Sequence, residues 1–375
     1  PASAGGERQA NRHPPGRAGA VVRKPQHAAV VAAPSYEAKR FGVKTGMPTW
    51  EAIKLCPRLR IVLEDPDKYA ACSQRLFNVL RTFTPKVEVF SIDEAFLDLT
   101  QTLRDYRNPH HAAADIKRRL RLELGPFIRC SIGLAPSKTL AKIASELDKP
   151  NGLVWVRPEE VPAWLERLEV DAACGINARL KRRLAQLGVR TLAELGRCPP
   201  GRLRKAFGIW GHHLHLIGQG KDPMPLNPNA LETSRKGFGH TRVLRYPYPG
   251  FAEARDLLAL LCHKVARRMR GKGFAGRVVH LHAAAAEDWG VARQRALPVA
   301  TADELTLHRT CLVIARELER EGRLPDRLQV LGVSVTGLCR LDGMPLALFP
   351  QHRRRERLLA AMDAINDEWG DFAAY

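Results

Sequence analysis

Several features that define other protein classes are absent from this chain of 375 residues. None of its eight cysteines forms a CxxC pair, which argues against a zinc site or a disulfide framework and favours buried free thiols in a reducing cytoplasm. No apolar run approaches the ~18 residues of a membrane span, and no early segment resembles the apolar core of a signal peptide. No repeat with a period of roughly 20–50 residues is present. We therefore expect a cytoplasmic protein without a membrane partner.

Acidic residues are scarce as well. The chain carries 60 Lys and Arg against 39 Asp and Glu, a net charge of +21, although its apolar content of 45% is ordinary for a globular protein. The imbalance is strongest in residues 177–220, where nine basic residues face Glu194 alone. So basic a chain favours a polyanionic partner such as nucleic acid.

The length allows two to four domains, and the order of helix and strand patterns predicts an α+β multidomain fold. Residues 1–27 are rich in Ala, Gly, Pro and Arg and are expected to form a flexible basic arm. Pro158 and Pro162 mark a boundary before a basic helical region, and residues 227–236 are expected to be an extended linker. Further helices are predicted at 49–56, 68–83, 112–124, 253–272 and 302–321, and strands at 28–32, 129–134, 277–283 and 328–336.

The most informative segment is SIDEAFLDL, which contains the adjacent acids Asp93 and Glu94. Val87 and Val89 precede them with the alternation of a half-buried strand, and a second apolar run follows. Two short strands that turn at these acids would form a hairpin with both carboxylates at one end. Because no basic residue lies within four positions to offset their repulsion, a Mg²⁺ ion suits the pair. A solvated acidic turn is the alternative.

The segment SYEAKRFGVKTGMP (35–48) combines a phenol with basic side chains on a turn punctuated by glycines. Tyr36, Lys39, Arg40 and Lys44 can each contact phosphate oxygens, so the segment suits a triphosphate. An ordinary basic surface is the alternative.

The segment SIGLAPSKTLAKIASELDKPNG (131–152) predicts a helix with Ser137 as its N-cap. Lys138 and Lys142 would share one face of this helix. If the helix packs against the acidic hairpin, these lysines would face the carboxylates and a metal-bound phosphate. If it does not, they form a solvated edge.

Residues 174–195 and 199–220 resemble two helix-hairpin-helix units. Such a hairpin exposes backbone N–H groups at a helix N-terminus, which can bind a DNA phosphate without reading sequence. The usual hairpin has two glycines, whereas Gly175-Ile176-Asn177 keeps only the first. The nearby His212, His213 and His215 suggest a partly solvated helix face rather than a metal site, because no Cys or carboxylate accompanies them.

In order and spacing, these segments resemble the Y-family, or translesion, DNA polymerases, close to the DNA polymerase IV and UmuC-like branches. The resemblance runs from about residue 20 to 370 and includes RKGFGHTRVL (235–244) and LQVLGVSVTGL (328–338). It implies a right-handed polymerase, a monomer that uses primer–template DNA and deoxynucleoside triphosphates. The implied domains are fingers (28–66), palm (67–157), helix-hairpin-helix thumb (158–226), little finger (237–338) and a C-terminal tail (339–375).

The resemblance also implies residue roles. Asp93 would ligate Mg²⁺, and Glu94 would ligate the primer-side metal or help to activate the primer 3′-hydroxyl. Tyr36 and the basic residue three positions on would hold the triphosphate, with Lys142 contacting it from the palm. The family has Arg then Lys where this chain has Lys39 then Arg40, so either could bind. The residues expected to contact DNA are Gly175, Asn177, Lys181, Arg182 and Arg242.

One departure from the family concerns its first strand, of the type DxDxFF, which supplies a further metal-binding Asp and an aromatic gate against ribonucleotides. Residues 1–34 contain no Asp, Phe or Tyr. Either the chain is truncated at its N-terminus or the basic arm replaces the strand, and in both cases we expect impaired activity. The alternative function is a non-catalytic DNA- and clamp-binding accessory factor.

The tail contains a further resemblance, to the QLxLF peptide that binds the sliding clamp. Leu346, Leu348 and Phe349 match it, while Pro345 replaces the glutamine. These side chains would either fill an apolar pocket on the clamp or pack loosely on their own domain.

Overall fold

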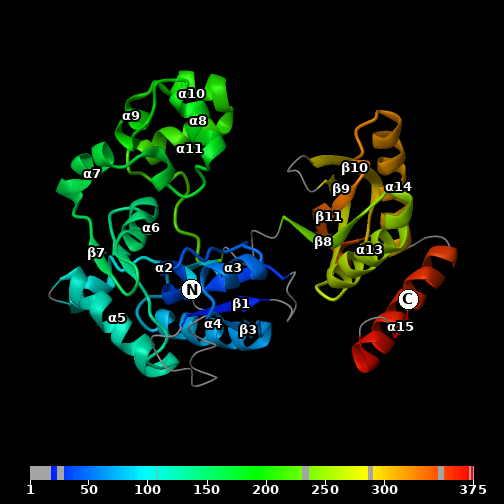
Figure 1. Cartoon of the computed structure of the whole chain (residues 1–375), viewed down its shortest axis with the longest axis horizontal. Coiled ribbons are helices and arrows are strands. Elements are labelled where there is room, and N and C mark those ends of the chain that lie inside the picture. Colours follow the sequence, from blue (N-terminus) through cyan, green and yellow to red (C-terminus); the bar gives the residue numbers. More distant parts are fainter. Residues whose placement is uncertain are drawn as a thin grey trace. The chain divides into compact units, whose positions relative to one another are not determined.

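The computed structural model describes residues 18–22, 29–106, 108–229, 236–285, 290–344, 350–370 and 373–374. The chain divides into two units, Pro1–Thr233 and Ser234–Tyr375. The boundary falls inside the predicted linker. Each unit combines helices with strands (Figure 1), so the prediction of an α+β multidomain protein is confirmed.

The first part of the N-terminal unit is a three-stranded sheet of order β2-β1-β3. Its centre, β1, is antiparallel to β2 and parallel to β3. The prediction of a flexible arm over residues 1–27 is therefore wrong for β1, and the rest of that arm lies outside the described residues, Ala18 excepted. The short run Ala20-Val21-Val22 is buried, and Ala20 packs against Ala38 and Ala52 of the neighbouring helices; the surrounding basic residues obscured the run in the sequence. The elements are β1 (Gly19–Val22), β2 (Val31–Pro34), α2 (Tyr36–Arg40), α3 (Thr49–Leu55) and β3 (Arg60–Leu63).

The next part contains the acidic hairpin, and its strands form two separate two-stranded sheets, β4-β5 antiparallel and β6-β7 parallel. Helices α4 and α5 pack on β4 through Phe77, Leu80, Ile116 and Leu120. Each helix begins where the sequence supplies an Asp or Asn N-cap followed by proline. The elements are α4 (Pro66–Arg81), β4 (Val87–Ser91), β5 (Glu94–Leu97), η1 (Thr102–Asp105), α5 (Pro109–Leu124), β6 (Ile132–Leu134), α6 (Lys138–Leu147) and β7 (Leu153–Trp155).

The basic region is helical, as predicted. Its apolar core includes Leu184, Leu192, Leu203 and Leu214, and Leu140 of α6 belongs to the same core. Helix α6 therefore joins the basic region to the acidic hairpin. The elements are η2 (Pro158–Glu160), α7 (Val161–Arg167), η3 (Val170–Ala172), α8 (Ala178–Ala185), α9 (Leu192–Arg197), α10 (Pro200–Phe207) and α11 (Ile209–Gly218).

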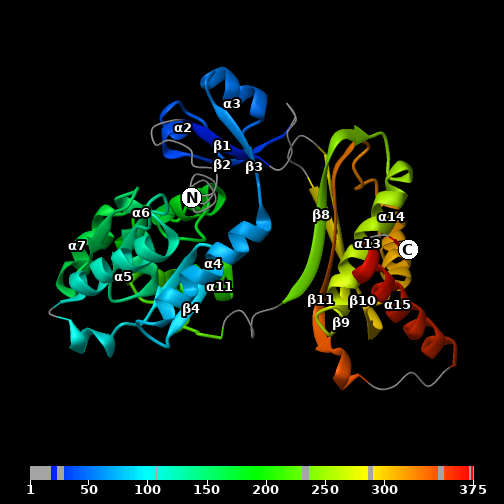
Figure 2. The same cartoon turned by 90° about the horizontal axis from the view of Figure 1, so that it is seen from below.

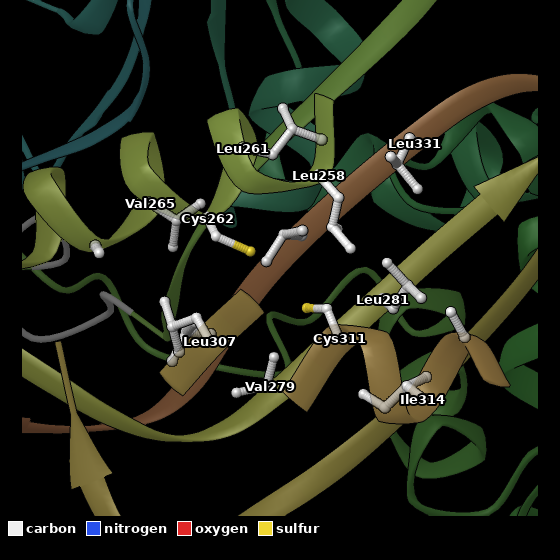
Figure 3. Close-up of a cluster of buried hydrophobic side chains, with 14 of the residues drawn as sticks. Leu258, Leu261, Cys262, Val265, Val279, Leu281, Leu307, Cys311, Ile314 and Leu331 are labelled. Carbon is white, nitrogen blue, oxygen red and sulfur yellow. The ribbon is translucent and has the colours of Figure 1, made fainter. Parts of the chain in front are cut away.

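The C-terminal unit is an antiparallel sheet of order β10-β9-β11-β8 with α13 and α14 on one face (Figure 2). Leu258, Cys262 and Cys311 of these helices meet Leu281 and Leu331 of the sheet in the core (Figure 3). The predicted helix–strand–helix–strand plan found both central strands but missed both edge strands. Edge strands pair on one side only, and β8 and β10 carry polar residues that mask the strand pattern. The elements are β8 (Gly237–Tyr248), η4 (Ala252–Ala254), α13 (Arg255–Arg270), β9 (Phe274–Ala284), β10 (Gly290–Thr301), α14 (Glu304–Arg320) and β11 (Leu328–Arg340).

The C-terminal tail is the last part of the fold. The tail, for which no helix was predicted, contains η5 (Leu341–Gly343) and a long helix, α15 (Pro350–Trp369). All eight cysteines are free, but only four are buried as expected, since Cys72 and Cys130 are half-buried and Cys174 and Cys339 are exposed. Within the described residues, no helix is both long and apolar enough to cross a membrane.

Candidate active site

The acidic hairpin has the predicted geometry. Strands β4 and β5 pair Val87 with Leu97 and Ser91 with Glu94, which leaves Ile92 and Asp93 in the turn. The Ser91 hydroxyl lies 3.0 Å from Asp93 Oδ1 and 3.5 Å from Glu94 Oε2. The two carboxylates thus approach one hydroxyl at the tip of the hairpin.

Helix α6 packs against this hairpin and presents Lys142 to it. The Lys142 ammonium lies 2.6 Å from Glu94 Oε1 and 2.7 Å from Glu146 Oε1. Burial opposes the charge on Lys142, but the hydrogen bonds to Glu146 and Glu94 outweigh it and raise the pKa of the ammonium. The predicted meeting of lysine and carboxylate is confirmed for Lys142, whereas Lys138 pairs with Glu88 at 2.8 Å.

The N-terminus of α6 is anchored by a residue that the sequence did not single out. The Asp222 carboxylate accepts hydrogen bonds from the backbone N–H groups of Lys138 (2.7 Å) and Thr139 (2.9 Å). A carboxylate at this position also interacts favourably with the helix dipole. Asp222 lies 84 residues from Lys138, so no local pattern could reveal the contact. Glu146 was also missed, although its spacing of four from Lys142 was a usable signal.

Tyr36, Lys39 and Arg40 share the short helix α2. Ser35 caps this helix by accepting a hydrogen bond from the Ala38 N–H (3.2 Å). The Lys39 ammonium lies 5.1 Å from the centre of the Tyr36 ring, so the phenol and this cation are neighbours, while Arg40 is exposed on the next position. In the described part of the chain, no recorded hydrogen bond or ion pair joins these three residues to Asp93 or Glu94.

The predicted hairpin at Gly175 is a tight turn before α8. Gly175 has φ 95°, a left-handed conformation that favours glycine. Asn177 caps α8 by accepting a hydrogen bond from the Leu180 N–H (2.9 Å). Residues 171–177 share a cavity of about 440 Å³ with Lys142 and Glu146 of α6. The hairpin and the lysine of the acidic site therefore line the same hollow.

The other residues expected to contact DNA differ in their availability. Lys181 pairs with Glu169 and with Asp171, the latter at 2.9 Å. Arg182 on α8 and Arg242 on β8 are exposed. The residues expected to bind a clamp, Leu346, Leu348 and Phe349, lie outside the described residues.

Among the described residues, no third carboxylate joins Asp93 and Glu94 in a group that could hold a metal. Asp98, the residue after β5, is the next acid along the chain, but hydrogen bonds from Thr100 and then from Lys86 hold it and lower its pKa to about 2. Four residues of strand place it about 13 Å from Glu94. In the part of the chain that the structure describes, no group of three or more His, Cys, Asp or Glu could hold a metal ion.

Comparisons with known proteins identify the family of this chain. Residues 9–146 match the impB/mucB/samB family, and residues 235–348 match the C-terminal domain of that family. A DNA polymerase IV of Pelotomaculum thermopropionicum is 36% identical over 345 residues, which cover 91% of this chain and 84% of the relative. A DNA polymerase IV of Alkalilimnicola ehrlichii is 34% identical over 338 residues, 89% of this chain and 92% of the relative.

Solved structures similar to this chain are also Y-family DNA polymerases. A Y-family DNA polymerase chimera superposes with a TM-score of 0.78 at 27% identity, covering 90% of this chain and 97% of the chimera. An insertion ternary complex of Dbh DNA polymerase has a TM-score of 0.57 at 26% identity, with coverage of 90% and 97%. Since relatives above 30% identity span most of both chains, the protein belongs to the Y-family of translesion DNA polymerases, in the DNA polymerase IV group.

Proposed function

We propose that the tip of the β4–β5 hairpin is where this translesion polymerase joins a deoxynucleotide to the primer, opposite damaged template. One observation carries the proposal: the carboxylates of Asp93 and Glu94 both approach the Ser91 hydroxyl, and the ammonium of Lys142 contacts Glu94 from a different element. Carboxylates suit a divalent cation, and an ammonium suits a phosphate. Phosphoryl transfer needs both kinds of group.

The carboxylates of Asp93 and Glu94 fit Mg²⁺, because they are hard oxygen ligands with spare lone pairs and lie at an accessible tip. A bound Mg²⁺ pair would stabilise the attacking and leaving oxygens of the transfer. Asp93 would hold the metal, and Glu94 would hold the primer-side metal or take up the proton of the primer 3′-hydroxyl. The single hydroxyl hydrogen of Ser91 is donated to Asp93 Oδ1 (3.0 Å) and orients that carboxylate.

Three groups are proposed to bind the incoming triphosphate. Lys142 contacts it from α6, where Glu146 and the Asp222 cap hold the lysine in position. Tyr36 and one basic neighbour contact it from α2. Of the two neighbours, Lys39 is favoured, since it already lies beside the Tyr36 ring.

DNA is proposed to lie along the basic helical region and the C-terminal sheet. The hairpin at Gly175 and Asn177 offers backbone N–H groups at the start of α8, and Arg182 and Arg242 are exposed cations. These assignments keep the domain names inferred from the sequence: fingers, palm, thumb and little finger. Because the substrate is DNA, we also propose a cytoplasmic location, and Leu346, Leu348 and Phe349 stay candidates for binding a sliding clamp.

A non-catalytic role as a DNA- and clamp-binding accessory factor is the second candidate. The observation that favours it is the count of carboxylates: only two gather at the hairpin tip among the described residues. Two-metal sites usually need a further ligand to hold both ions. Retention of Lys142 against Glu94 argues the other way, since an inactive scaffold needs no such pair.

The test compares Asp93→Ala and Glu94→Ala, made in the chain preceded by a DxDxFF-type strand so that the parent protein is active. We expect a loss of incorporation on the order of 10³-fold or more, because metal-held charge is removed from the transition state. Binding to primer–template DNA should change little. Near-parental extension rates in both variants would contradict the metal assignment.

A further inference from the structure

Helix α6 is held between two parts of the N-terminal unit. Lys142 contacts Glu94 of the acidic hairpin, whereas Leu140 is buried (1% exposed) in the apolar core of the basic helical region. Lys142 and Leu140 are two positions apart, so their side chains point roughly 200° apart around the helix. Because a helix of 10 residues moves as one body, the core that holds Leu140 also determines where the Lys142 ammonium lies.

A carboxylate that follows the basic helical region closes the N-terminus of α6. The first N–H groups of an α-helix have no acceptor inside the helix. In α6, Asp222 accepts hydrogen bonds from the N–H groups of Lys138 (2.7 Å) and Thr139 (2.9 Å) and from the Thr139 hydroxyl (3.0 Å). The Ser137 hydroxyl accepts one from the N–H of Leu140 (3.3 Å). Since side-chain oxygens satisfy these three N–H groups, this end of α6 serves as a joint inside the protein.

Asp222 is tied in turn to helix α11, which ends in a Schellman motif. The N–H of Gly220 donates to the carbonyl oxygen of Ile217 (2.9 Å), and the N–H of Lys221 donates to that of Leu216 (3.0 Å). Asp222 is the next residue along the chain. Its backbone therefore follows the end of α11, one residue beyond the last of these hydrogen bonds.

The same turn packs closely against α6. Gly220 has φ 70°, a left-handed conformation that favours glycine, and a Cβ atom there would lie 3.1 Å from Leu140 Cδ1. Pro223 follows Asp222 and restricts its backbone to extended conformations. The turn thus leaves Asp222 little freedom and holds its carboxylate at the first residues of α6.

We propose that Asp222 is a positioning residue for the incoming triphosphate, because it fixes α6 to the end of α11 and so places Lys142 at the hairpin tip. The proposal rests on the proposed role of Lys142 as a triphosphate ligand. Lys138, the first residue of α6, is about one helical turn (~6 Å) from Lys142, so a shift of the N-terminus is carried directly to the ammonium. Asp222 acts through α6 and not by contact with the triphosphate. The seating of the basic helical region on α6 then sets how tightly the site binds a nucleotide.

Equilibrium binding of the next correct deoxynucleoside triphosphate tests the proposal. The protein is the chain preceded by a DxDxFF-type strand, and the primer ends in a dideoxynucleotide, so that no incorporation occurs. Asp222→Ala should raise the dissociation constant of the triphosphate on the order of tenfold, because one charge-assisted contact is weakened. Asp222→Asn keeps one carbonyl oxygen and should give an intermediate value. The affinity of both variants for primer–template DNA should change little.

Asp65 provides a matched control, because its carboxylate also caps a helix. It accepts a hydrogen bond from the N–H of Lys68 at the start of α4 (3.0 Å), and no residue of α4 is proposed to bind a nucleotide. Asp65→Ala should lower the urea midpoint of unfolding, as Asp222→Ala does, but leave the affinity for the triphosphate unchanged. If Asp222→Ala binds the triphosphate as tightly as the parent protein, Asp222 is a structural cap only and the proposal is overturned.

A double-mutant cycle separates this proposal from the proposed role of Lys142 itself. If Asp222 acts through Lys142, adding Asp222→Ala to Lys142→Met should weaken triphosphate binding no further. Fully additive losses would overturn the proposal, because Asp222 would then affect the site by another route. An unchanged affinity of Lys142→Met alone would overturn the proposed role of Lys142, and the positioning role of Asp222 with it.

Discussion

The Lys142 ammonium lies 2.6 Å from Glu94 Oε1, so the side chain proposed to bind the triphosphate forms an ion pair with a side chain proposed to bind the metal. A second carboxylate, Glu146, lies 2.7 Å from the same ammonium. Lys142 can therefore leave Glu94 and still keep a negative partner one helical turn away. The site is arranged so that the charge on Glu94 is neutralised by a side chain when no cation is bound.

Replacing Lys142 should impair catalysis more than folding. We expect Lys142→Met to lower incorporation on the order of 10²-fold, as the loss of one preorganised charged donor does. The matched control is Lys138→Met on the same helix face. Its pair with Glu88 is part-buried, so it should cost about 1–3 kcal/mol of folding stability and leave incorporation by the folded enzyme largely intact.

Primer extension with the strand-extended chain and urea unfolding of both variants provide the measurements. Equal losses of incorporation in the two variants would mean that Lys142 has no special role at the hairpin tip.

The same contact predicts a change in metal binding without substrates. Lys142 competes with a cation for Glu94 and repels it through space. Lys142→Met should therefore tighten the binding of Mg²⁺ or Mn²⁺ to the protein alone, on the order of tenfold, measured by isothermal titration calorimetry. Glu94→Gln in the Lys142→Met background should remove the gain. An unchanged affinity of Lys142→Met for Mg²⁺ or Mn²⁺ would show that the ammonium does not compete with the cation for Glu94.

Two basic residues on α8 should differ in their effect on DNA binding. Arg182 is exposed, whereas Lys181 is paired with Glu169 and Asp171. Arg182→Ala should weaken binding to all DNA sequences alike and reduce the salt slope by about 0.9, the value for one phosphate contact. Lys181→Ala should have a smaller effect, because its charge is already neutralised. Fluorescence anisotropy at several salt concentrations measures both slopes, and a larger change for Lys181→Ala would reverse this assignment.

Central elements could be predicted from the sequence, and elements at the margins could not. Strands β9 and β11 each have partners on both sides and apolar residues directed at α13 and α14, so their patterns are strong. Edge strands β8 and β10 have one partner each and tolerate polar residues. Strand β1 is central, but only four residues long and set among basic residues, and its apolar run was too short to be recognised.

At the candidate site, features set by local sequence could be predicted and features set by long-range contacts could not. The spacing of Lys138 and Lys142 was enough to predict a lysine facing the acidic hairpin, because a helix face follows from local sequence. Which lysine meets Glu94 depends on the angle at which α6 crosses the hairpin. The Asp222 cap and the packing of Leu140 into the basic region fix the position of α6. Both contacts join residues far apart in the chain, so no local pattern contains them.

The ion pairs that hold α15 should contribute strongly to stability. Arg270 is 11% exposed and contacts both Glu304 and Asp363. Arg270→Met leaves the part-buried Asp363 without a cation and Glu304 with Arg355 alone, and should cost about 3–5 kcal/mol of unfolding free energy. Arg293→Met breaks a more exposed pair with Glu321, which water screens, and should cost much less stability than Arg270→Met. Chemical denaturation of the two variants, followed by circular dichroism, compares them, and similar losses would contradict the idea of a buried anchor.

Finally, the 375 residues should incorporate nucleotides poorly unless a third carboxylate is supplied. The hairpin tip gathers only Asp93 and Glu94 among the described residues, and Asp98 is held at the far end of β5 by Thr100 and Lys86. Two cations that must lie a few ångströms apart are then weakly held, which should cost on the order of 10³-fold in rate. The sheets offer a place for the missing group, since β5 and β6 each have an edge without a strand partner among the described residues.

The experiment compares primer extension by the 375-residue chain with extension by the same chain preceded by a DxDxFF-type strand. The extended chain should incorporate nucleotides on the order of 10³-fold faster. A control chain whose added strand has both aspartates changed to asparagine should show no such gain. Both added strands could pair with the sheet in the same way. The difference in rate between them therefore reports the effect of the carboxylates and not the folding of the sheet. Comparable rates for all three proteins would show that the carboxylates of Asp93 and Glu94 suffice for incorporation and that a third carboxylate is not needed.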